Sequence, residues 1–558
     1  MSYLIRLFLL LPFVFGFLNC DAQSYAFRVK FKDKNGTLSF ADSSIILTPK
    51  SLARRAKQGI LLDSTDLPVV QSYIDTVLQT AAAVKLHNVS KWFNQIVVIT
   101  YDSTKATQIA QLPMVENVKF VARYAPGVFK IPAEIHDYKL ESKPIASAEK
   151  KTRGTSAYYG LSFQQMDIID IDCLHDLGFK GEGMDIAVMD VNFRYVNTCP
   201  QFDSLILENR IKDTKDYVKD TNYVFSVAIN NDHGMNSLSC MAANSPASYV
   251  GSAIKANYFL YITEDVATEQ PIEEDNWVSA AERADSLGVD LINTSLGYNL
   301  YSAPHTSYSY MDLNGQTSLI VKGTRYASAK GIFVVVAQGN EGANPWHYML
   351  TPADGDSVYS VGSVDGSGAW GQSSYGPTYD GRIKPDGCCI GKGVEIIFGY
   401  NGSCAPGATN GSSFAAPTMC GAIACLWQAF PHLTASQLKK AIIKSSSLYN
   451  SPNNTLGYGI PNFCTAYNTI LPTNNILYHT NQFLIYPNPT QYHFNISNLG
   501  NSKYTYKIYD IVGRLVYQHP TLILGESVCT ALEHQSSGDY IILLSSGDKS
   551  FSTKITKH

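Results

Sequence analysis

Four polar residues of this sequence stand where the local pattern could present a side chain to a substrate. Ser413 precedes a small and apolar run over residues 418–426, and Pro417 between them is tolerated only near the start of a helix. A helix is therefore expected to begin close to Ser413. Its dipole and unpaired N–H groups would stabilise an oxyanion there, so the hydroxyl could act as a nucleophile in acyl transfer. Alternatively, Ser413 is only the N-cap of this helix.

The other three candidates are Asp190, His233 and Asn340. Asp190 follows an apolar strand, so its carboxylate is expected at the carboxyl end of a parallel sheet, where α/β proteins place their sites. Asn340 ends another apolar strand through a glycine turn, and its amide could donate a hydrogen bond to an oxyanion. His233 stands before a glycine and a helix-like run of small residues. Alternatively, each of the three could be an ordinary turn or capping residue. The occurrence of all four candidates in the order Asp, His, Asn, Ser within one region favours a catalytic role.

The sequence around these candidates has the pattern of alternating strands and helices, which would position their side chains. Apolar, β-branched runs occur at residues 186–189, 289–293, 332–337 and 358–364, with helix-like stretches between them. Near-continuous apolar strands joined by helices indicate a parallel sheet that is buried on both faces. The fold class expected for this region is therefore α/β, with helices on both faces of the sheet.

Further domains are expected on either side, since 558 residues exceed the size of one hydrophobic core. Residues 24 to about 125 read as a small α+β domain with strand-like runs at 45–47 and 95–101. A polar, basic segment over residues 139–154 is expected to be an exposed linker. After about residue 470, short alternating strands separated by turns indicate a β-sandwich of roughly 75 residues.

The N-terminus carries an export signal. Arg6 precedes an apolar run at residues 7–15, and small residues shortly after it offer a cleavage point. This run is shorter than the roughly 20 residues that span a bilayer, so a signal peptide over residues 1–22 is favoured over a membrane anchor. Lipid modification of Cys20 is the weaker alternative, because the residue before it is not small.

Net charge and cysteine content limit which partners, disulfides and metal sites are expected. The formal net charge is −4, which does not indicate a nucleic-acid partner. Export permits disulfides among the eleven cysteines, and Cys388 and Cys389 with Cys404 nearby could form a loop bridge. Three others are expected as buried free thiols because they lie in small, apolar stretches: Cys240, Cys420 and Cys425. No cysteine pairs stand at zinc-finger spacing, so a structural metal site is not indicated.

On these motifs, residues 156–470 resemble the subtilisin-like serine peptidases, or subtilases. The resemblance rests on the strand ending in Asp190, on His233-Gly234, on Gly339-Asn340 and on the signature from Gly411 to Pro417. Weaker similarities to the family are found at residues 293–297 and at Lys384-Pro385-Asp386. The sequence departs from the family pattern at Ser412, at Val191-Asn192 and at Met235-Asn236. These departures remove no catalytic group, but the last two could reshape the site.

The resemblance implies a subtilisin-like fold and the chemistry of a serine endopeptidase. Ser413 would attack the peptide carbonyl, while His233, supported by Asp190, moves the proton. Asn340 and the backbone N–H of Ser413 would hold the oxyanion. Five residues stand at positions that line the substrate cleft in this family. The resemblance implies that they bind the polypeptide substrate as an added strand: Ser295, Leu296, Gly297, Ala337 and Gly339.

The segment at 23–150 is similar to the pro-regions of exported subtilases. The similarity lies in Arg54-Arg55 and in residues 66–69 and 91–94. It implies an intramolecular inhibitor that is later removed, with Lys150 to Gly154 as the expected place of cutting. A permanent accessory domain is the alternative.

Residues 480–558 resemble the C-terminal sorting domain of the type IX secretion system. The matching features are Tyr486-Pro487-Asn488-Pro489, residues 508–514 and Gly538-Asp539-Tyr540. The resemblance implies export by the type IX machinery of a Gram-negative bacterium, and a protein that is secreted or held at the outer cell surface.

The expected function is that of a secreted serine endopeptidase. A catalytically silent surface protein of the same fold, which binds polypeptides through the same cleft, is the alternative, because fold alone does not fix function. The chemistry requires no cofactor. The sequence does not decide whether a structural calcium ion binds. Asp232 or Asp380 could serve as ligands, but no EF-hand-like loop supplies the ligand spacing.

Overall fold

The computed structural model forms two compact units, Met1–Leu471 and Pro472–His558. The residues that it describes are 23–37, 39, 46–80, 84–125, 156–400, 403–471, 483–486, 490, 493–498, 503–519, 526–546 and 549–557. The predicted signal peptide and the linker at 139–154, with its expected cutting place, lie outside these ranges. Within them, no helix combines the length and apolar character needed to cross a membrane.

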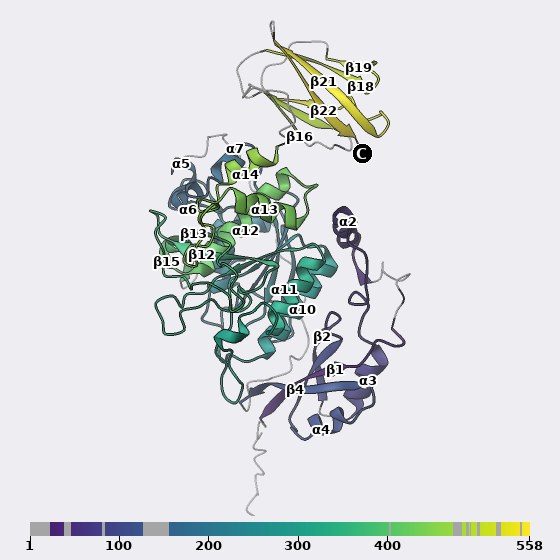
Figure 1. Cartoon of the computed structure of the whole chain (residues 1–558), viewed down its shortest axis with the longest axis vertical. Helices are drawn as coiled ribbons and strands as arrows, with labels where there is room; N and C mark the ends of the chain where they lie inside the picture. The colour runs from purple at the N-terminus through teal and green to yellow at the C-terminus, as the bar shows by residue number, and fades with distance from the viewer. Residues whose placement is uncertain are drawn as a thin grey trace, which may run out of the picture. The chain divides into compact units, whose positions relative to one another are not determined.

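A seven-stranded parallel sheet forms the centre of the first unit (Figure 1). In spatial order its strands are β13 (Gly387–Ile390), β12 (Val358–Val364), β11 (Phe333–Ala337), β10 (Leu291–Thr294), β5 (Asp185–Asp190), β9 (Asn257–Ile262) and β6 (Ile211–Asp216). The four apolar runs predicted from the sequence are β5, β10, β11 and β12. The α/β prediction is therefore confirmed.

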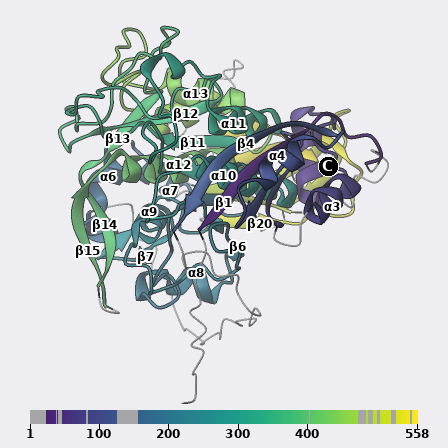
Figure 2. The same ribbon diagram turned by 90° about the horizontal axis from the view of Figure 1, so that it is seen from below.

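Helices cover both faces of this sheet, and the same elements can be followed from below in Figure 2. Helices α9 (His233–Ala242) and α12 (Ser412–Ala429) lie on one face, and α10 (Ile272–Leu287) and α11 (Leu319–Ala329) lie on the other. Along β5, Ile186 and Val188 join the first core, whereas Ala187 joins the second. The inner strands β5, β10, β11 and β12 are mostly apolar because both of their faces are buried, whereas the edge strand β6 is polar and partly exposed.

Smaller elements complete this region. The helices are α5 (Ser156–Tyr159), α6 (Phe163–Asp167), α7 (Asp172–Asp176), α8 (Asp203–Leu207), α13 (Ala435–Lys444) and α14 (Phe463–Ile470), with 3-10 turns at Pro200–Phe202 and Tyr310–Asp312. The antiparallel pairs are β14 (Lys392–Tyr400) with β15 (Ser403–Asn410) and β7 (Asn244–Ser245) with β8 (Tyr249–Val250).

The N-terminal part is the predicted α+β domain. Its antiparallel sheet has the order β2 (Val84–Ser90), β3 (Gln95–Thr100), β1 (Ser24–Phe31), β4 (Val115–Tyr124), and its helices are α2 (Pro49–Gln58), α3 (Gln71–Gln79) and α4 (Lys105–Ala110). The run at 95–101 is β3, but the strand expected at 45–47 is wrong, since Ile46 is helical and Leu47 forms a bend. Thr48 accepts a hydrogen bond from Ser51 N (3.3 Å) and so caps α2, which turns the chain into a helix at this point.

The N-terminal domain docks on the α10 carboxylates of the sheet region. Glu282 accepts hydrogen bonds from Ser90 Oγ (2.6 Å), Lys91 N (2.8 Å) and Trp92 N (3.1 Å). Asp275 accepts two hydrogen bonds from one edge of the Arg28 guanidinium, from Nε at 2.7 Å and from Nη2 at 2.5 Å. Charge-assisted bonds of this kind are directional, so they fix how the two domains sit against each other.

A buried ion cluster at the end of α10 adds to this docking. Asp285 is fully buried and accepts from Arg54 (2.5 Å) and Arg55 (2.6 Å), and Arg55 also reaches Asp66 (2.8 Å). Lys330 contacts Asp66 at 3.0 Å. Removing one member of such a cluster leaves its partners as uncompensated buried charges.

We expect Asp285→Asn to destabilise the unprocessed chain by about 3–5 kcal/mol, because Arg54 and Arg55 lose their shared carboxylate. Urea denaturation of an inactive full-length chain measures the change. The matched control is Glu116→Gln, since the exposed Glu116 pairs with the exposed Lys30 and should contribute at most about 1 kcal/mol. Equal effects of the two variants would contradict the prediction.

Two disulfides join distant segments of the sheet region, Cys173–Cys464 and Cys199–Cys404. The expected loop bridge between Cys404 and the pair at 388 and 389 is wrong: Cys404 pairs with Cys199, and both Cys388 and Cys389 are buried in strand β13 as free thiols. The strand buries these thiols in the apolar core, where Cys388 packs with Val394 and Ile396 of β14. Cys240, Cys420 and Cys425 are buried free thiols, as predicted.

The second unit is the predicted β-sandwich. One sheet has the order β16 (Phe483–Tyr486), β17 (Phe494–Asn498), β20 (Glu526–Cys529), and the other β19 (Leu515–Gln518), β18 (Thr505–Asp510), β21 (Gly538–Ser546), β22 (Lys549–Lys557). One core joins them, with Phe494 and Ile496 from the first sheet and Ile508 and Ile542 from the second.

Candidate active site

Asp190 and His233 are in direct contact at the carboxyl end of β5. The His233 Nδ1 and Asp190 Oδ1 atoms lie 2.7 Å apart, and the side chains are 30% and 1% exposed respectively. Burial lowers the pKa of His233, but the charge and hydrogen bond of Asp190 raise it, and the net shift of the pKa is upward. A carboxylate on Nδ1 holds the ring in one tautomer and leaves Nε2 to accept a proton.

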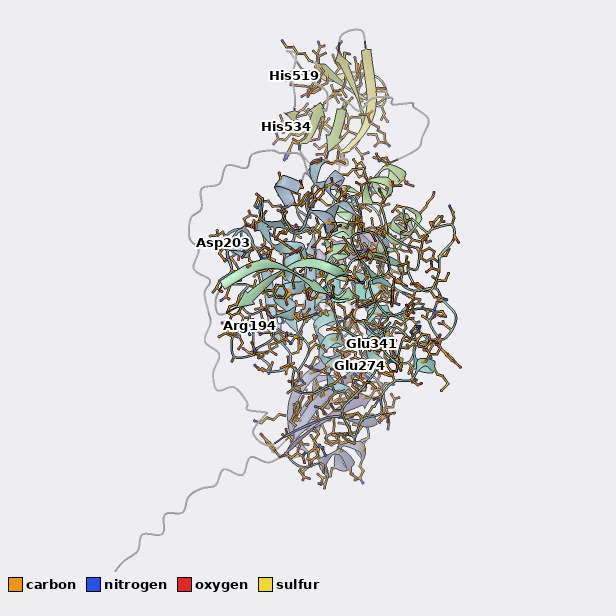
Figure 3. The ribbon with its side chains drawn as sticks, turned by 90° about the vertical axis from the view of Figure 1, so that its left-hand side faces the viewer. Arg194, Asp203, Glu274, Glu341, His519 and His534 are labelled. Atoms are coloured by element: carbon orange, nitrogen blue, oxygen red, sulfur yellow. A yellow bond between two sulfur atoms is a disulfide. The ribbon has the colours of Figure 1, made fainter. Side chains whose placement is uncertain are left out.

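Asn192, one of the departures from the family pattern, holds the loop that leads to His233. Its Nδ2 donates to the carbonyl oxygens of Ser226 (2.9 Å) and Asn231 (3.1 Å). Asn231 in turn accepts a hydrogen bond from the His233 backbone N–H at 2.9 Å. The loop and the strand end are therefore tied together next to the imidazole. Arg194, labelled in Figure 3, belongs to the same segment.

Gly234 lets helix α9 approach strand β5. A Cβ on this residue would lie 2.5 Å from Asn192 O and 3.1 Å from Asp190 Cβ, closer than a side chain tolerates. The glycine after the histidine is thus a packing requirement that brings His233 within reach of Asp190. Any larger residue would push the imidazole away from the carboxylate.

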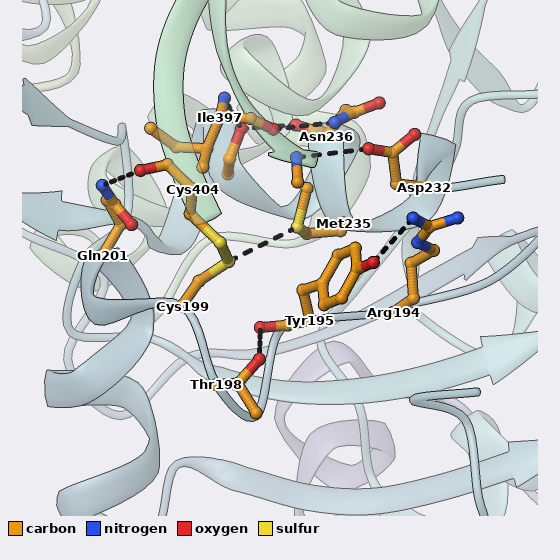
Figure 4. Close-up of a disulfide and its surroundings, with 12 residues drawn as sticks. Arg194, Tyr195, Thr198, Cys199, Gln201, Asp232, Met235, Asn236, Ile397 and Cys404 are labelled. Carbon is orange, nitrogen blue, oxygen red and sulfur yellow. Dashed lines mark hydrogen bonds between the residues drawn. A yellow bond between two sulfur atoms is a disulfide. The ribbon is translucent and has the colours of Figure 1, made fainter. Parts of the chain in front are cut away.

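The departures at Met235 and Asn236 anchor the start of α9 on the β14–β15 hairpin, as Figure 4 shows. Asn236 Nδ2 donates to Ile397 O at 2.7 Å, and Met235 Sδ lies 3.9 Å from Cys199 Sγ of the disulfide. Both residues face the protein interior. They stabilise the helix that carries the histidine and do not block the site.

Ser413 is the second residue of α12, which begins at Ser412 as predicted. Asn340 Oδ1 accepts hydrogen bonds from Ser412 N (2.8 Å) and Ser412 Oγ (3.0 Å). Because two donors meet at Oδ1, the NH₂ group of the Asn340 amide is the end that can donate to a bound oxygen. Asn340 itself is exposed, so a substrate can reach it.

Two further contacts bring the candidate residues into one locality. Ser295 Oγ donates to Ser413 O at 2.8 Å, which joins the end of β10 to the start of α12. The rings of His233 and Phe414 have centroids 5.4 Å apart, which places the residue after Ser413 beside the histidine. Nucleophile, base and amide candidates therefore come from three different elements and meet at the carboxyl edge of the sheet.

A cavity of about 500 Å³ adjoins this locality. Asp190, His233 and the predicted cleft residues Ser295, Leu296 and Gly297 line it, together with the loop that follows β9. The predicted residues Ala337 and Gly339 are not among its lining residues. They stand at the end of β11, where Gly339 N donates to Ser412 Oγ at 3.1 Å.

Three glutamates, Glu264, Glu269 and Glu273, also line this cavity, with carboxylate oxygens within 4.8 Å of one another. Burial raises the pKa of Glu264 to about 8 and that of Glu269 to about 7. Glu264 accepts from the Tyr298 hydroxyl at 2.8 Å. Among the described residues these carboxylates are the ones that could hold a cation, but their raised pKa values also allow them to share protons without one.

Sequence reasoning missed the roles of Asn192, Ser412 and Asn236. Each is a departure from the family pattern, and that departure was the available signal. Glu264 and Glu273 were also missed, although an acidic stretch runs through this part of the sequence. Their convergence depends on the loop after β9 folding back on α10, which a linear pattern does not show.

The comparisons with known proteins agree with this geometry. Residues 181–459, half of the chain, match the subtilase family. Residues 26–134 match the peptidase S8 propeptide domain of Bacteroidota, and residues 484–558 match the secretion system C-terminal sorting domain. The sorting domain indicates a secreted or cell-surface protein.

Curated relatives include subtilisin DY of Bacillus licheniformis, 25% identical over 282 residues that cover 50% of this chain and 89% of that protein. The alkaline protease of Alkalihalobacillus alcalophilus is 25% identical over 330 residues, which cover 58% and 74%.

The solved structure of fervidolysin from Fervidobacterium pennivorans shares the fold at a TM-score of 0.52 and 16% identity, covering 94% of this chain and 71% of that one. Since the family match spans half of the chain and the parallel sheet carries its motifs, this protein belongs to the subtilase family of serine peptidases.

Proposed function

We propose that this secreted serine peptidase cleaves polypeptides internally with a triad of Asp190, His233 and Ser413, through an acyl-enzyme intermediate. His233 takes the proton of Ser413 as its Oγ attacks the peptide carbonyl, and then gives it to the leaving amine. The observation that carries the proposal is the 2.7 Å contact between His233 Nδ1 and the buried Asp190, which leaves Nε2 as the base.

Asn340 and the backbone N–H of Ser413 hold the oxyanion in this mechanism. Support comes from the two bonds that Ser412 makes to Asn340 Oδ1, which turn the amide NH₂ outward. The N-terminus of α12 adds the positive end of a helix dipole at the same place. Donors that are fixed before the reaction cost no reorganisation when charge develops.

The N-terminal domain acts as an intramolecular inhibitor in this proposal. Its last described strand, β4, ends beside the cavity of the active site, where Arg123 N donates to Gln270 Oε1 at 2.7 Å. In this proposal the whole protein is exported by the type IX machinery, and the substrates of the mature enzyme are polypeptides. The chemistry uses protein groups alone, and structural calcium remains a prediction.

A fluorophosphonate probe tests the proposal. After removal of the N-terminal domain, the native protein should gain one adduct, which peptide mass spectrometry should locate on Ser413 and not on the neighbouring Ser412. The probe reacts only with an activated serine, so it reports the nucleophile without knowledge of the substrate. A processed, folded chain that takes no label would count against the triad and favour the silent polypeptide-binding protein.

Asn340→Ala should lower kcat by about 10²–10³-fold and change KM little, because an oxyanion donor acts mainly in the transition state. Steady-state kinetics on a peptide substrate measure both constants. The matched control is Asn344→Ala, since Asn344 is exposed and bonds within its own loop to Glu341, at 2.6 Å. A rise in KM with unchanged kcat would overturn the role given to Asn340.

A further inference from the structure

The Cys199–Cys404 disulfide joins two chain segments that flank the proposed triad residues (Figure 4). Cys199 belongs to the loop that follows Asp190 at the end of β5. Cys404 belongs to β15, and this strand runs through Gly411 directly into the start of α12, where Ser413 lies. The bond therefore fixes the segment after the carboxylate to the segment before the nucleophile.

Helix α9, which begins with His233, rests against the same bond. Met235 Sδ lies 3.9 Å from Cys199 Sγ. Gly399 of β14 is the ladder partner of the second cysteine, and its N–H donates to Oδ2 of Asp232 at 3.3 Å. Asp232 stands directly before the histidine in the chain. The segments that carry all three triad residues consequently meet at this disulfide.

Strand β15 contributes little buried surface that could hold it in place. None of its residues from 404 to 410 is buried, whereas β14 buries Ile396 and Ile397 in the core. The two strands form a sheet of their own, and an isolated two-stranded hairpin is only marginally stable. At its first residues, β15 is anchored by the disulfide and by a hydrogen bond from Gln201 Nε2 to Cys404 O, at 3.3 Å.

We propose that the Cys199–Cys404 disulfide is a positioning element of the active site, which keeps His233 and Ser413 in the geometry that proton transfer requires. The inference rests on the proposed function. A misplacement of about 1 Å, caused by a change away from the chemistry, can lower a rate by about 10²-fold. A chain without this bond is therefore folded but slow, because the strand that leads to the nucleophile has lost its anchor.

Two double variants of the processed protein test the inference: Cys199→Ala with Cys404→Ala, and as matched control Cys173→Ala with Cys464→Ala. The control bond joins α7 to α14, which carry no candidate residue, and it spans 291 positions against 205, so its loss should lower Tm at least as much. Loss of Cys199–Cys404 should lower kcat about 10²-fold, leave KM within about twofold and slow fluorophosphonate labelling of Ser413. The control should keep the native kcat and labelling rate.

Reduction gives a second measurement on the native protein, in which no cysteine is replaced. Dithiothreitol converts a disulfide to two thiols and is itself oxidised to a cyclic disulfide. During stepwise reduction, kcat should fall with the reduced fraction of Cys199–Cys404, measured by mass-spectrometric thiol mapping, and not with that of Cys173–Cys464. Circular dichroism should remain native, and kcat should recover when the bond forms again.

The outcomes separate this inference from the proposed function. If the native protein is labelled on Ser413 and the variant without Cys199–Cys404 is labelled and turns over at the native rate, the positioning role is wrong and the triad stands. Equal losses of kcat in the two double variants would mean that both disulfides only stabilise the fold. A native, processed protein that takes no label overturns the triad itself. Thiol mapping on the native protein decides the matter should the double variant fail to fold.

Discussion

Ser413→Ala is expected to lower kcat by about 10⁶-fold, the largest effect of any single change in this protein. Without the hydroxyl no acyl-enzyme can form, and only the hydrogen-bond donors and substrate binding still accelerate hydrolysis, by about 10³–10⁴-fold over water. Single-turnover hydrolysis of a peptide substrate by the processed protein measures the loss. Substrate binding should be nearly unchanged, because the alanine methyl fits the same position.

Ser367→Ala is the matched control, since Ser367 is an exposed serine of a surface turn whose hydroxyl donates to Asp365 of the same turn. It should hydrolyse the peptide at the native rate. Residual activity of Ser413→Ala within tenfold of the native enzyme would mean that another group is the nucleophile. The assignment of His233 would then lose its main support as well.

The fold could be predicted from the sequence where a strand is buried on both faces. β5 and β11 consist entirely of buried residues, so their apolar runs left no ambiguity about a parallel sheet. The short run at 45–47 had the same composition without the length, and the cap at Thr48 turned the chain into a helix. Local capping chemistry thus outweighed the apolar signal of three residues.

Disulfide pairing could not be predicted, because proximity in sequence says little about proximity in the fold. Cys199 and Cys404 are 205 positions apart, yet the hairpin of β14 and β15 returns to the loop after β5. By contrast, Cys388 and Cys389 were expected to take part in a loop bridge but lie inside a strand of the central sheet. Only the topology of the sheet distinguishes these cases.

The positions of the four candidate residues could be predicted, and the contacts that support them could not. Asp190, His233, Asn340 and Ser413 were visible because each stands at the end of a strand or the start of a helix. The supports act across long distances in the chain: Ser412 bonds to Asn340 over 72 residues, and Asn236 bonds to Ile397 over 161 residues. Such contacts depend on packing, which a single sequence does not display.

Asp190→Asn should lower kcat by about 10⁴-fold while the protein remains folded. An asparagine amide can donate to Nδ1 of His233, and that bond favours the wrong tautomer, in which Nε2 carries the proton and cannot act as the base. The nucleophile then loses its proton acceptor. Peptide hydrolysis at neutral pH measures the loss.

The pH dependence of the activity that remains in Asp190→Asn provides a second test of the role of Asp190. Burial lowers the pKa of His233, but the charge and hydrogen bond of Asp190, together with the charges of Asp232 and Glu264, raise it, and the net shift of the pKa is upward in the native protein. His233 must be neutral to accept a proton, so native activity is lost as pH falls through this raised pKa. In Asp190→Asn the raising charge is gone, and the acid limb of kcat/KM should move to lower pH.

Asp232→Asn is the control that separates charge from orientation. Asp232 also raises the pKa of His233 through its charge, but its carboxylate bonds to Gly399 N (3.3 Å) and not to the imidazole. The Asp232 variant should shift the acid limb slightly in the same direction and keep most of its kcat. Should both variants lose activity equally, the negative charge near His233 would be what matters, and the tautomer argument for Asp190 would fail.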